Sequence, residues 1–225
     1  MSGAVSIQRV DLNEQVYDAL KARLLMRELG PRAKLRLQAI ADELDVSRSP
    51  VQHALTRLVA EGLVEVDRRG YHVRALTPTL MCEAFDVRCA LELFAADRSV
   101  GQVTVEQLSE LRRLSGQTAE FVADGRMTSK QGYMTANKAF HEYMVDLAGN
   151  GQLSHTYRSL SLHELMERAL AEHTSAAGSS TDDHERIVRG FEAGDLMATR
   201  AAIEANVRTG KQLALETLDA SGGAL

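Results

Sequence analysis

Residues 39–63, AIADELDVSRSPVQHALTRLVAEGL, decide the fold of the N-terminal part of this chain. The spacing of their apolar residues predicts two short helices joined by a tight turn at Asp45 and Val46. In the first helix the apolar residues lie at i, i+1 and i+4, so they share one face. The residues of this face are Ile40, Ala41 and Leu44.

The second of these helices carries start and stop signals. Ser47 is placed to cap it by accepting a backbone N–H bond, and Pro50 falls in the first turn, where its missing N–H costs little. Gly62 is expected to take the left-handed conformation that commonly follows a helix C-terminus. The side predicted to be buried consists of Val51, Leu55, Leu58 and Val59.

The opposite face of the second helix is polar and suits contact with a DNA duplex. Hydroxyl groups and backbone N–H groups at a helix N-terminus donate to phosphates, and an arginine fork can read guanine. The pattern therefore predicts a helix-turn-helix whose second helix enters the major groove. A helical hairpin with an ordinary polar surface is the alternative for these two helices alone. The predicted DNA-contacting residues of this helix are Ser47, Arg48, Ser49, Gln52, His53 and Arg57.

The next segment favours the DNA-binding interpretation. Residues 63–66 form a short apolar run, and residues 71–76 alternate around Val73. Between these runs lies a basic turn, so the segment predicts a β-hairpin with a cationic tip. Helix, turn, helix and basic hairpin together describe a winged helix. The residues of the predicted tip are Arg68, Arg69 and Gly70.

Residues 46–73, VSRSPVQHALTRLVAEGLVEVDRRGYHV, resemble the DNA-binding domain of the GntR family of bacterial transcription regulators. That family's pattern is VSRTPVREAL, followed by a leucine-rich helix, EGL and a wing of basic residues and glycine, and the likeness extends over residues 16–74. Gln52 stands where the family usually has arginine, and His53 where it has glutamate. Gln38, also predicted to contact DNA, stands in the preceding helix where relatives often carry a charged residue. These departures from the family pattern affect which operator sequence the protein is expected to read, and not whether it binds DNA.

The length, hydrophobic content and charge distribution of the chain fit a regulator of two domains. Of its 225 residues 44% are hydrophobic, and the net charge is −5. Residues 1–78 carry 12 basic and 10 acidic side chains, whereas the remainder carries 14 and 21. No run of about 18 apolar residues and no leader segment occurs, so we expect a soluble, cytoplasmic protein. Cys82 and Cys89 are expected to be core residues in a reducing compartment.

The C-terminal part reads as helix throughout. Thr104 and Gln107 form a capping box, and Asp182 is expected to cap a later helix. We therefore predict a mainly α protein, with a winged helix-turn-helix domain over residues 1–76, a linker at 77–79 and an all-α helical bundle over 80–225 that can enclose a pocket. The helices are expected at about 80–100, 104–123, 129–147, 151–172, 182–192 and 194–217.

Three segments of this part resemble the FCD effector-binding domain of FadR-type regulators: FDVRCALELFAADRS, NKAFHEYMVDLAGNGQL and DHERIVRGFEAGDLMATRAAIEANV. The resemblance implies an effector site in the bundle. Arg88, at the family's arginine position and four residues before Glu92, is the candidate for holding a carboxylate. The predicted effector-binding residues are Arg88, Asn137, His141, His184 and Asn206.

In many relatives the last four of these positions are one aspartate and three histidines that hold a divalent metal. Only His141 and His184 keep a metal-binding side chain here, and the carboxamides of Asn137 and Asn206 bind zinc, nickel or manganese much less firmly. We therefore expect no cofactor. Two interpretations stay open: a weakened metal site at His141 and His184, or a hydrogen-bonded polar lining for a neutral ligand or an ordered water.

The resemblance implies a ligand-responsive, DNA-binding transcription regulator. It is expected to be a homodimeric repressor that binds an inverted-repeat operator and is released by a small organic acid or related metabolite. The sequence contains no Gly-rich phosphate loop, GxSxG elbow or HExxH motif, so no enzyme is predicted. The alternatives are a metal-dependent enzyme that uses His141 and His184, and an architectural DNA-binding protein whose bundle only dimerises.

Overall fold

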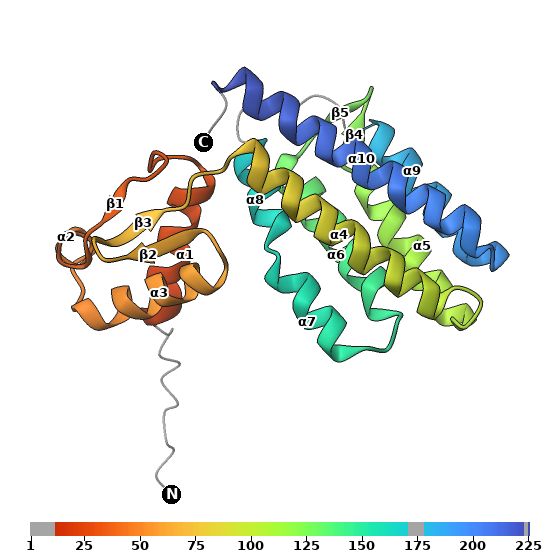
Figure 1. The fold of residues 1–225 in the computed structure, drawn as a ribbon, viewed down its shortest axis with the longest axis horizontal. Helices are drawn as coiled ribbons and strands as arrows, with labels where there is room; N and C mark the ends of the chain where they lie inside the picture. Colours follow the sequence, from red (N-terminus) through yellow and green to blue (C-terminus); the bar gives the residue numbers. More distant parts are fainter. Residues whose placement is uncertain (1–11, 171–177, 223–224) are drawn as a thin grey trace, which may run out of the picture. The chain divides into compact units, whose positions relative to one another are not determined.

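The computed structural model describes residues 12–170, 178–222 and 225, and for residues 178–180 it describes the backbone only. The chain forms two compact units, residues 1–75 and 76–225 (Figure 1). None of the described helices is long and apolar enough to cross a membrane.

The N-terminal unit is a winged helix, as predicted. Its elements are α1 (Leu12–Leu25), β1 (Lys34–Leu35), α2 (Leu37–Glu43), α3 (Arg48–Ala60), β2 (Val64–Asp67) and β3 (Gly70–Val73). The three strands form an antiparallel sheet in the order β1-β3-β2. The strand β1 was not predicted, because two residues are too few to show an alternating pattern.

A small hydrophobic core joins α1, α3 and the sheet. Val51, Leu55 and Leu58 of α3 are fully buried, as the spacing of the second predicted helix requires. They pack in one cluster with Leu20 and Leu24 of α1. This packing fixes which side of α3 stays in solvent, so the predicted polar face is turned outward.

The ends of α3 agree with the prediction in one respect and differ in another. Gly62 has a φ of 68°, a backbone conformation that favours glycine, as predicted. Ser47 occupies the N-cap position, but its side chain makes no capping hydrogen bond. The capping role predicted for the Ser47 hydroxyl is therefore wrong.

The C-terminal unit is a helical bundle. Its helices are α4 (Pro78–Ser99), α5 (Val105–Ala119), α6 (Lys130–Asp146), α7 (Gly151–Ser159), α8 (Leu162–Ala169), α9 (Gly178–Ala193) and α10 (Leu196–Ala220). The long helices α4 and α10 run side by side, α9 packs on α10, and α5 packs on α6 and α9 (Figure 1). Phe85, Phe140, Phe191 and Met144 lie at the centre of their common core.

Several predicted boundaries in this unit are wrong for identifiable reasons. The helix expected over residues 151–172 breaks at Ser161, which has a φ of 49°. The helix expected to reach residue 123 ends at Ala119, and a hairpin of β4 (Val122–Ala123) and β5 (Arg126–Met127) follows. Asp124 and Gly125 at its turn both have positive φ, as a two-residue hairpin loop demands.

The predicted linker and one predicted cap also need correction. Residues 77–79 belong to the start of α4, because Oγ1 of Thr77 accepts from the backbone N–H of Leu80 at 3.2 Å and Pro78 is the first helical residue. Asp182 lies inside α9, which already begins at Gly178, so it cannot be the N-cap. The capping box of Thr104 and Gln107 is confirmed.

Candidate functional sites

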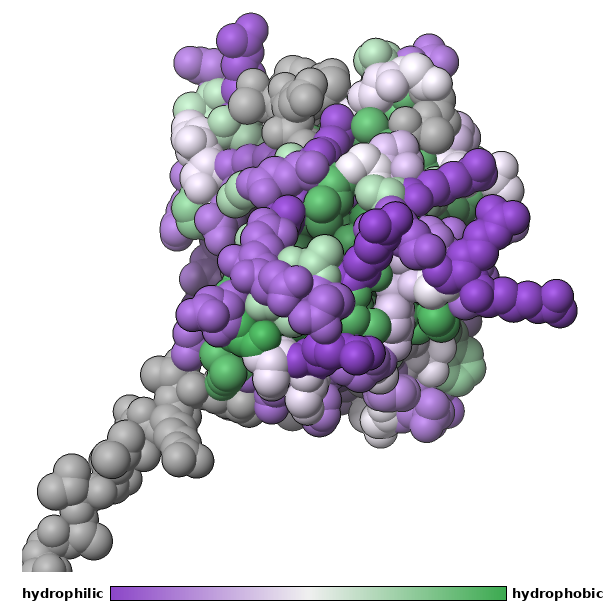
Figure 2. All heavy atoms as spheres, turned by 90° about the vertical axis from the view of Figure 1, so that its left-hand side faces the viewer, coloured by the Kyte–Doolittle hydropathy of each residue, from purple (hydrophilic) through white to green (hydrophobic). Residues whose placement is uncertain are grey.

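The N-terminal end of α3 presents an exposed polar surface. Ser47, Arg48, Ser49 and His53 are all exposed, and the buried side of the helix faces α1. Because the Ser47 side chain does not cap α3, the first backbone N–H groups of this helix stay available to an external acceptor. Figure 2 shows the molecule from the side of α2 and the sheet, where long hydrophilic side chains project between small hydrophobic areas.

The two glutamines predicted to contact DNA make hydrogen bonds within the N-terminal unit. Nε2 of Gln52 donates to the hydroxyl of Tyr71, so this side chain ties α3 to β3. Nε2 of Gln38 donates to Oδ1 of Asp42 one turn further along α2, at 2.7 Å. Both amides are therefore held in fixed orientations by groups of the protein itself.

Arg57 is held against α1, unlike the other residues predicted on this face. Its guanidinium carbon lies 3.5 Å from the ring centroid of Tyr17, as in a cation–π contact. Nη1 also donates to Oε2 of Glu14 at 2.8 Å, and Nε to Oε1 of Glu61 at 3.3 Å. The sequence-based prediction did not anticipate this arrangement, in which Arg57 helps to join α1 and α3.

The predicted wing is formed by β2, β3 and the turn between them. Arg68 and Arg69 are exposed at its tip, as predicted. Oδ1 of Asp67 accepts from the backbone N–H of Arg69 at 2.7 Å, which stabilises the turn. Gly70 has a φ of 109°, a conformation that side-chain-bearing residues rarely adopt. Two cations are thus presented on a short, fixed hairpin.

The second site is a buried polar cluster in the helical bundle. Arg88 of α4 donates from Nε to Oε1 of Glu92 at 2.8 Å, one turn along the same helix. Its Nη2 donates to Oδ1 of Asn206 on α10 at 2.9 Å and lies 2.9 and 3.1 Å from the ring nitrogens of His141 on α6. The hydroxyl of Tyr157 on α7 donates to Glu92 at 2.7 Å. The ion pair of Arg88 and Glu92 thus joins four helices, α4, α6, α7 and α10.

The two histidines continue this network. Nε2 of His141 lies 3.1 Å from Nε2 of His184, and Nδ1 of His184 lies 3.1 Å from Oγ1 of Thr118. The Thr118 hydroxyl donates to the carbonyl of Ser115 and so accepts from Nδ1 of His184. Nδ1 of His141 also lies 3.2 Å from Oε1 of Glu92. Burial lowers the pKa of both histidines, that of His184 well below its usual range. Burial therefore favours the neutral form of both rings.

The donor set of this cluster does not fit a divalent metal. His141, His184 and Asn206 come together, but the cationic guanidinium of Arg88 lies within 3.1 Å of His141 and Asn206 and uses their lone pairs. A second cation there would be repelled, with no carboxylate supplied by Asn137 or Asn206 to balance it. Within the described ranges, no group of three or more His, Cys, Asp or Glu side chains is arranged to hold a metal ion.

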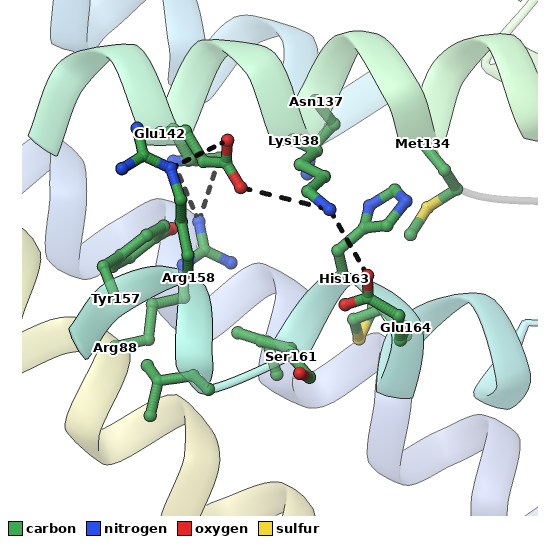
Figure 3. Close-up of a pocket in the computed structure, with 14 residues that line it drawn as sticks. Arg88, Met134, Asn137, Lys138, Glu142, Tyr157, Arg158, Ser161, His163 and Glu164 are labelled. Carbon is green, nitrogen blue, oxygen red and sulfur yellow. Dashed lines mark hydrogen bonds and ion pairs between the residues drawn. The ribbon is translucent and has the colours of Figure 1, made fainter. Parts of the chain in front are cut away.

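Two small cavities reach this cluster, each of about 50 Å³. One opens between α6, α7 and α8, where Lys138 of α6 donates to Glu164 of α8 at 3.3 Å (Figure 3). The other lies beside α10, next to Thr209 and Gly210. The residues that line both cavities are Arg88, Met134, Asn137 and Met166.

These contacts show which site residues the sequence predicted and which it missed. Arg88, His141, His184 and Asn206 do converge, and Asn137 lies half-buried on the wall of both cavities. Tyr157 and Thr118 were not predicted, although each bonds to a member of the cluster. Neither residue carries a local signal, because an isolated tyrosine or threonine on a helix is more often part of a core or a surface.

The two units together define a winged-helix transcription regulator with a helical C-terminal domain. The chain belongs to the GntR family of bacterial regulatory proteins, whose model matches residues 12–73. The FCD domain model matches residues 83–209, so the C-terminal unit is an FCD domain of the FadR type. These proteins are transcription regulators and not enzymes.

Relatives with assigned names agree with this family. The chain is 28% identical over 190 residues to the probable D-xylose utilization operon transcriptional repressor of Paenarthrobacter nicotinovorans, covering 84% of this chain and 82% of that protein. It is 28% identical over 140 residues to the uncharacterized HTH-type transcriptional regulator YdhC of Bacillus subtilis. The matched region covers 62% of each protein, which is less than two thirds of that relative. The solved structure of E. coli McbR/YncC shares the fold, with a TM-score of 0.72 at 22% identity over 92% of this chain and 98% of that one.

Proposed function

We propose that the chain is a homodimeric repressor that binds an inverted-repeat operator and releases it when a small organic acid or related metabolite enters the FCD domain. The observation that carries this proposal is the pairing of an exposed recognition surface on α3 with a separate cavity that ends at a buried arginine. Repression is supported by the name of the Paenarthrobacter nicotinovorans relative, a transcriptional repressor of an operon. Family membership supports binding to duplex DNA.

On the DNA side, α3 would lie in the major groove with its N-terminal turn toward the bases. Within the described part of the chain, the Arg48 side chain forms no ion pair or hydrogen bond, so its guanidinium is available to read a base edge. Ser47 and Ser49 would donate to phosphates, as would the wing cations. The proposed contacts are Gln38, Ser47, Arg48, Ser49, Gln52, His53, Arg68, Arg69 and Gly70, with Arg57 left out because it is bound to α1.

Arg48→Ala should reduce operator affinity about tenfold to a hundredfold and relax selectivity at one base position, because an arginine fork on guanine contributes about 1–3 kcal/mol. Arg68→Ala is the matched control, since an exposed wing cation should weaken binding to all sequences alike and reduce its salt dependence. Selection from a randomised DNA pool measures both effects. Unchanged base preference in the Arg48→Ala protein would remove Arg48 from base reading.

On the effector side, the guanidinium of Arg88 favours an anion. Nη1 of Arg88 has no hydrogen-bond partner among the described residues, and it lies beside Gly210 on the wall of the second cavity. Lys138 and Arg158 line the entrance between α6 and α7, where they are paired with Glu164 and Glu142 (Figure 3). A cavity of about 50 Å³ admits a group the size of a carboxylate. A larger effector would have to separate Lys138 from Glu164 and so move α8. In the proposed dimer, this movement would change how the DNA-binding units of the two chains are held.

Small carboxylates should raise the melting temperature of the protein and weaken its operator binding, whereas their uncharged amides should do neither. The reason is that Arg88 and Lys138 offer donors and positive charge to an anion, which the amides lack. Thermal melting with matched acid–amide pairs, followed by DNA binding in the presence of each hit, measures both effects. Equal stabilisation by neutral sugars such as D-xylose would overturn the choice of an organic acid.

A further inference from the structure

The outward side of α4 carries a row of exposed residues with apolar groups at its centre and opposite charges at its ends. At about 100° per residue, these positions fall within about 80° of the helix circumference. Val87 is 44% exposed and Phe94 is 46% exposed, so two apolar side chains reach solvent on this side of the helix. The residues of this row are Glu83, Val87, Ala90, Phe94 and Arg98.

Helices of the same unit pack on both flanks of the row. On one side, the exposed carboxylates Asp86 and Asp97 are paired with α10, since Asp86 accepts from Lys211 at 2.7 Å and Asp97 from Arg200 at 2.6 Å. On the other side, Leu91 packs against the cluster that includes Leu153 of α7. Figure 1 shows α4 between α10 and α7. The exposed row is therefore an outer strip of the C-terminal unit, bounded along its length by packed helices.

We propose that this row is the contact surface for a second copy of the chain, with the two α4 helices antiparallel about a twofold axis between Ala90 and Leu91. This inference rests on the homodimer of the proposed function and names its interface. In that arrangement Val87 faces the partner's Phe94, and Ala90 faces the partner's Leu91. A twofold axis makes every such contact twice, so a surface must complement itself.

The charges at the two ends complement each other in the same register. Glu83 faces the partner's Arg98, and Arg98 faces the partner's Glu83, about 11 Å on either side of the axis at about 1.5 Å per residue. Neither Glu83 nor Arg98 has an ion-pair partner within residues 12–170 and 178–222. The small side chain of Ala90 next to the axis lets the helices approach closely, as antiparallel helices crossing at about 20° require. A parallel arrangement would instead place like charges opposite each other.

A charge exchange on the full-length protein tests this register. Glu83→Arg alone and Arg98→Glu alone each place like charges opposite each other twice, and each should raise the dimer dissociation constant at least about tenfold. The combined Glu83→Arg/Arg98→Glu protein restores opposite charges and should dimerise within about threefold of the original. Sedimentation velocity measures all four proteins against the chain mass of 24.6 kDa.

A second pair of variants separates the interface from general surface effects. Phe94→Glu should dissociate the dimer, whereas Val105→Glu is the matched control, because Val105 is 78% exposed but lies on α5. Urea unfolding of each variant checks that the fold is retained. An original protein that is monomeric at micromolar concentration would overturn the proposed homodimer itself. A dimeric original protein whose Phe94→Glu variant stays dimeric, or single charge variants that the double variant fails to rescue, would overturn only the α4 interface.

Discussion

Replacing Arg88 with methionine is expected to lower the free energy of unfolding of the C-terminal unit by about 3–5 kcal/mol at neutral pH. The Glu92 carboxylate is completely buried, and Arg88 is the only full positive charge bonded to it among the described residues. Oε2 of Glu92 already has no hydrogen-bond partner there. Removing the guanidinium would leave a buried negative charge without compensation, which costs far more than the lost contacts of the arginine itself.

The matched control removes both charges. Arg88→Met/Glu92→Leu leaves no buried carboxylate, and replacement of a buried ion pair by apolar residues of similar volume is often neutral or stabilising. The double variant should therefore recover most of the stability lost in Arg88→Met. Urea unfolding of the original protein, both single variants and the double variant gives the coupling energy directly. A double variant as unstable as Arg88→Met would mean that Arg88 acts mainly through His141 and Asn206.

The cost of losing Arg88 should also depend on pH. Burial alone would raise the pKa of the Glu92 carboxyl, but the charge of Arg88 and the groups of His141 and Tyr157 hold this pKa well below its usual value of 4.5. Such a carboxyl adds stability above its unfolded pKa, and this is lost as the pH falls through the folded pKa. Without Arg88, burial dominates and protonation of Glu92 favours the folded variant. The destabilisation by Arg88→Met should thus be smaller near pH 5 than near pH 7.5.

The parts of the fold that the sequence predicted correctly depend on local signals. Pro50 can stand only in the first turn of α3, Gly62 has the positive φ expected after its end, and Thr104 with Gln107 starts α5. Each of these residues acts within four positions of the backbone that it shapes. The sequence also separates the buried and exposed sides of α3, because burial follows the 3.6-residue period of a helix.

The features that were missed depend on contacts between distant segments. Arg57 fits a DNA-facing pattern by spacing, but Tyr17 and Glu14 of α1 hold its guanidinium. The break at Ser161 requires a left-handed residue that neither glycine nor proline marks. The resemblance brings His141 and Asn206 into one site, yet it does not indicate that a guanidinium lies between them. The contacts of Arg57 and Arg88 depend on packing between segments 40 or more residues apart in the sequence.

The Arg88 guanidinium leads to a second large expected effect, on metal binding. After chelation and re-addition of zinc, the original protein should retain no stoichiometric metal, because the positive charge of Arg88 already uses the lone pairs of His141 and Asn206. Asn137→Asp/Asn206→His supplies a carboxylate and a third imidazole, which are ligands that zinc and nickel bind firmly. The new carboxylate also balances the charge of the ion. The double variant should therefore hold about one zinc ion per chain, as a site with four protein ligands does.

Elemental analysis of the two proteins decides this prediction, and two controls make the outcome specific. Adding His141→Ala to the double variant should abolish zinc retention, because it removes a ligand from the centre of the site. Asn206→His alone should retain less zinc than the double variant, since it lacks the carboxylate at residue 137. Stoichiometric zinc in the original protein would show that carboxamides suffice despite the neighbouring guanidinium. No gain in the double variant would mean either that the half-buried residue 137 does not reach the position where His141 and His184 meet, or that Arg88, which both proteins keep, still excludes the ion.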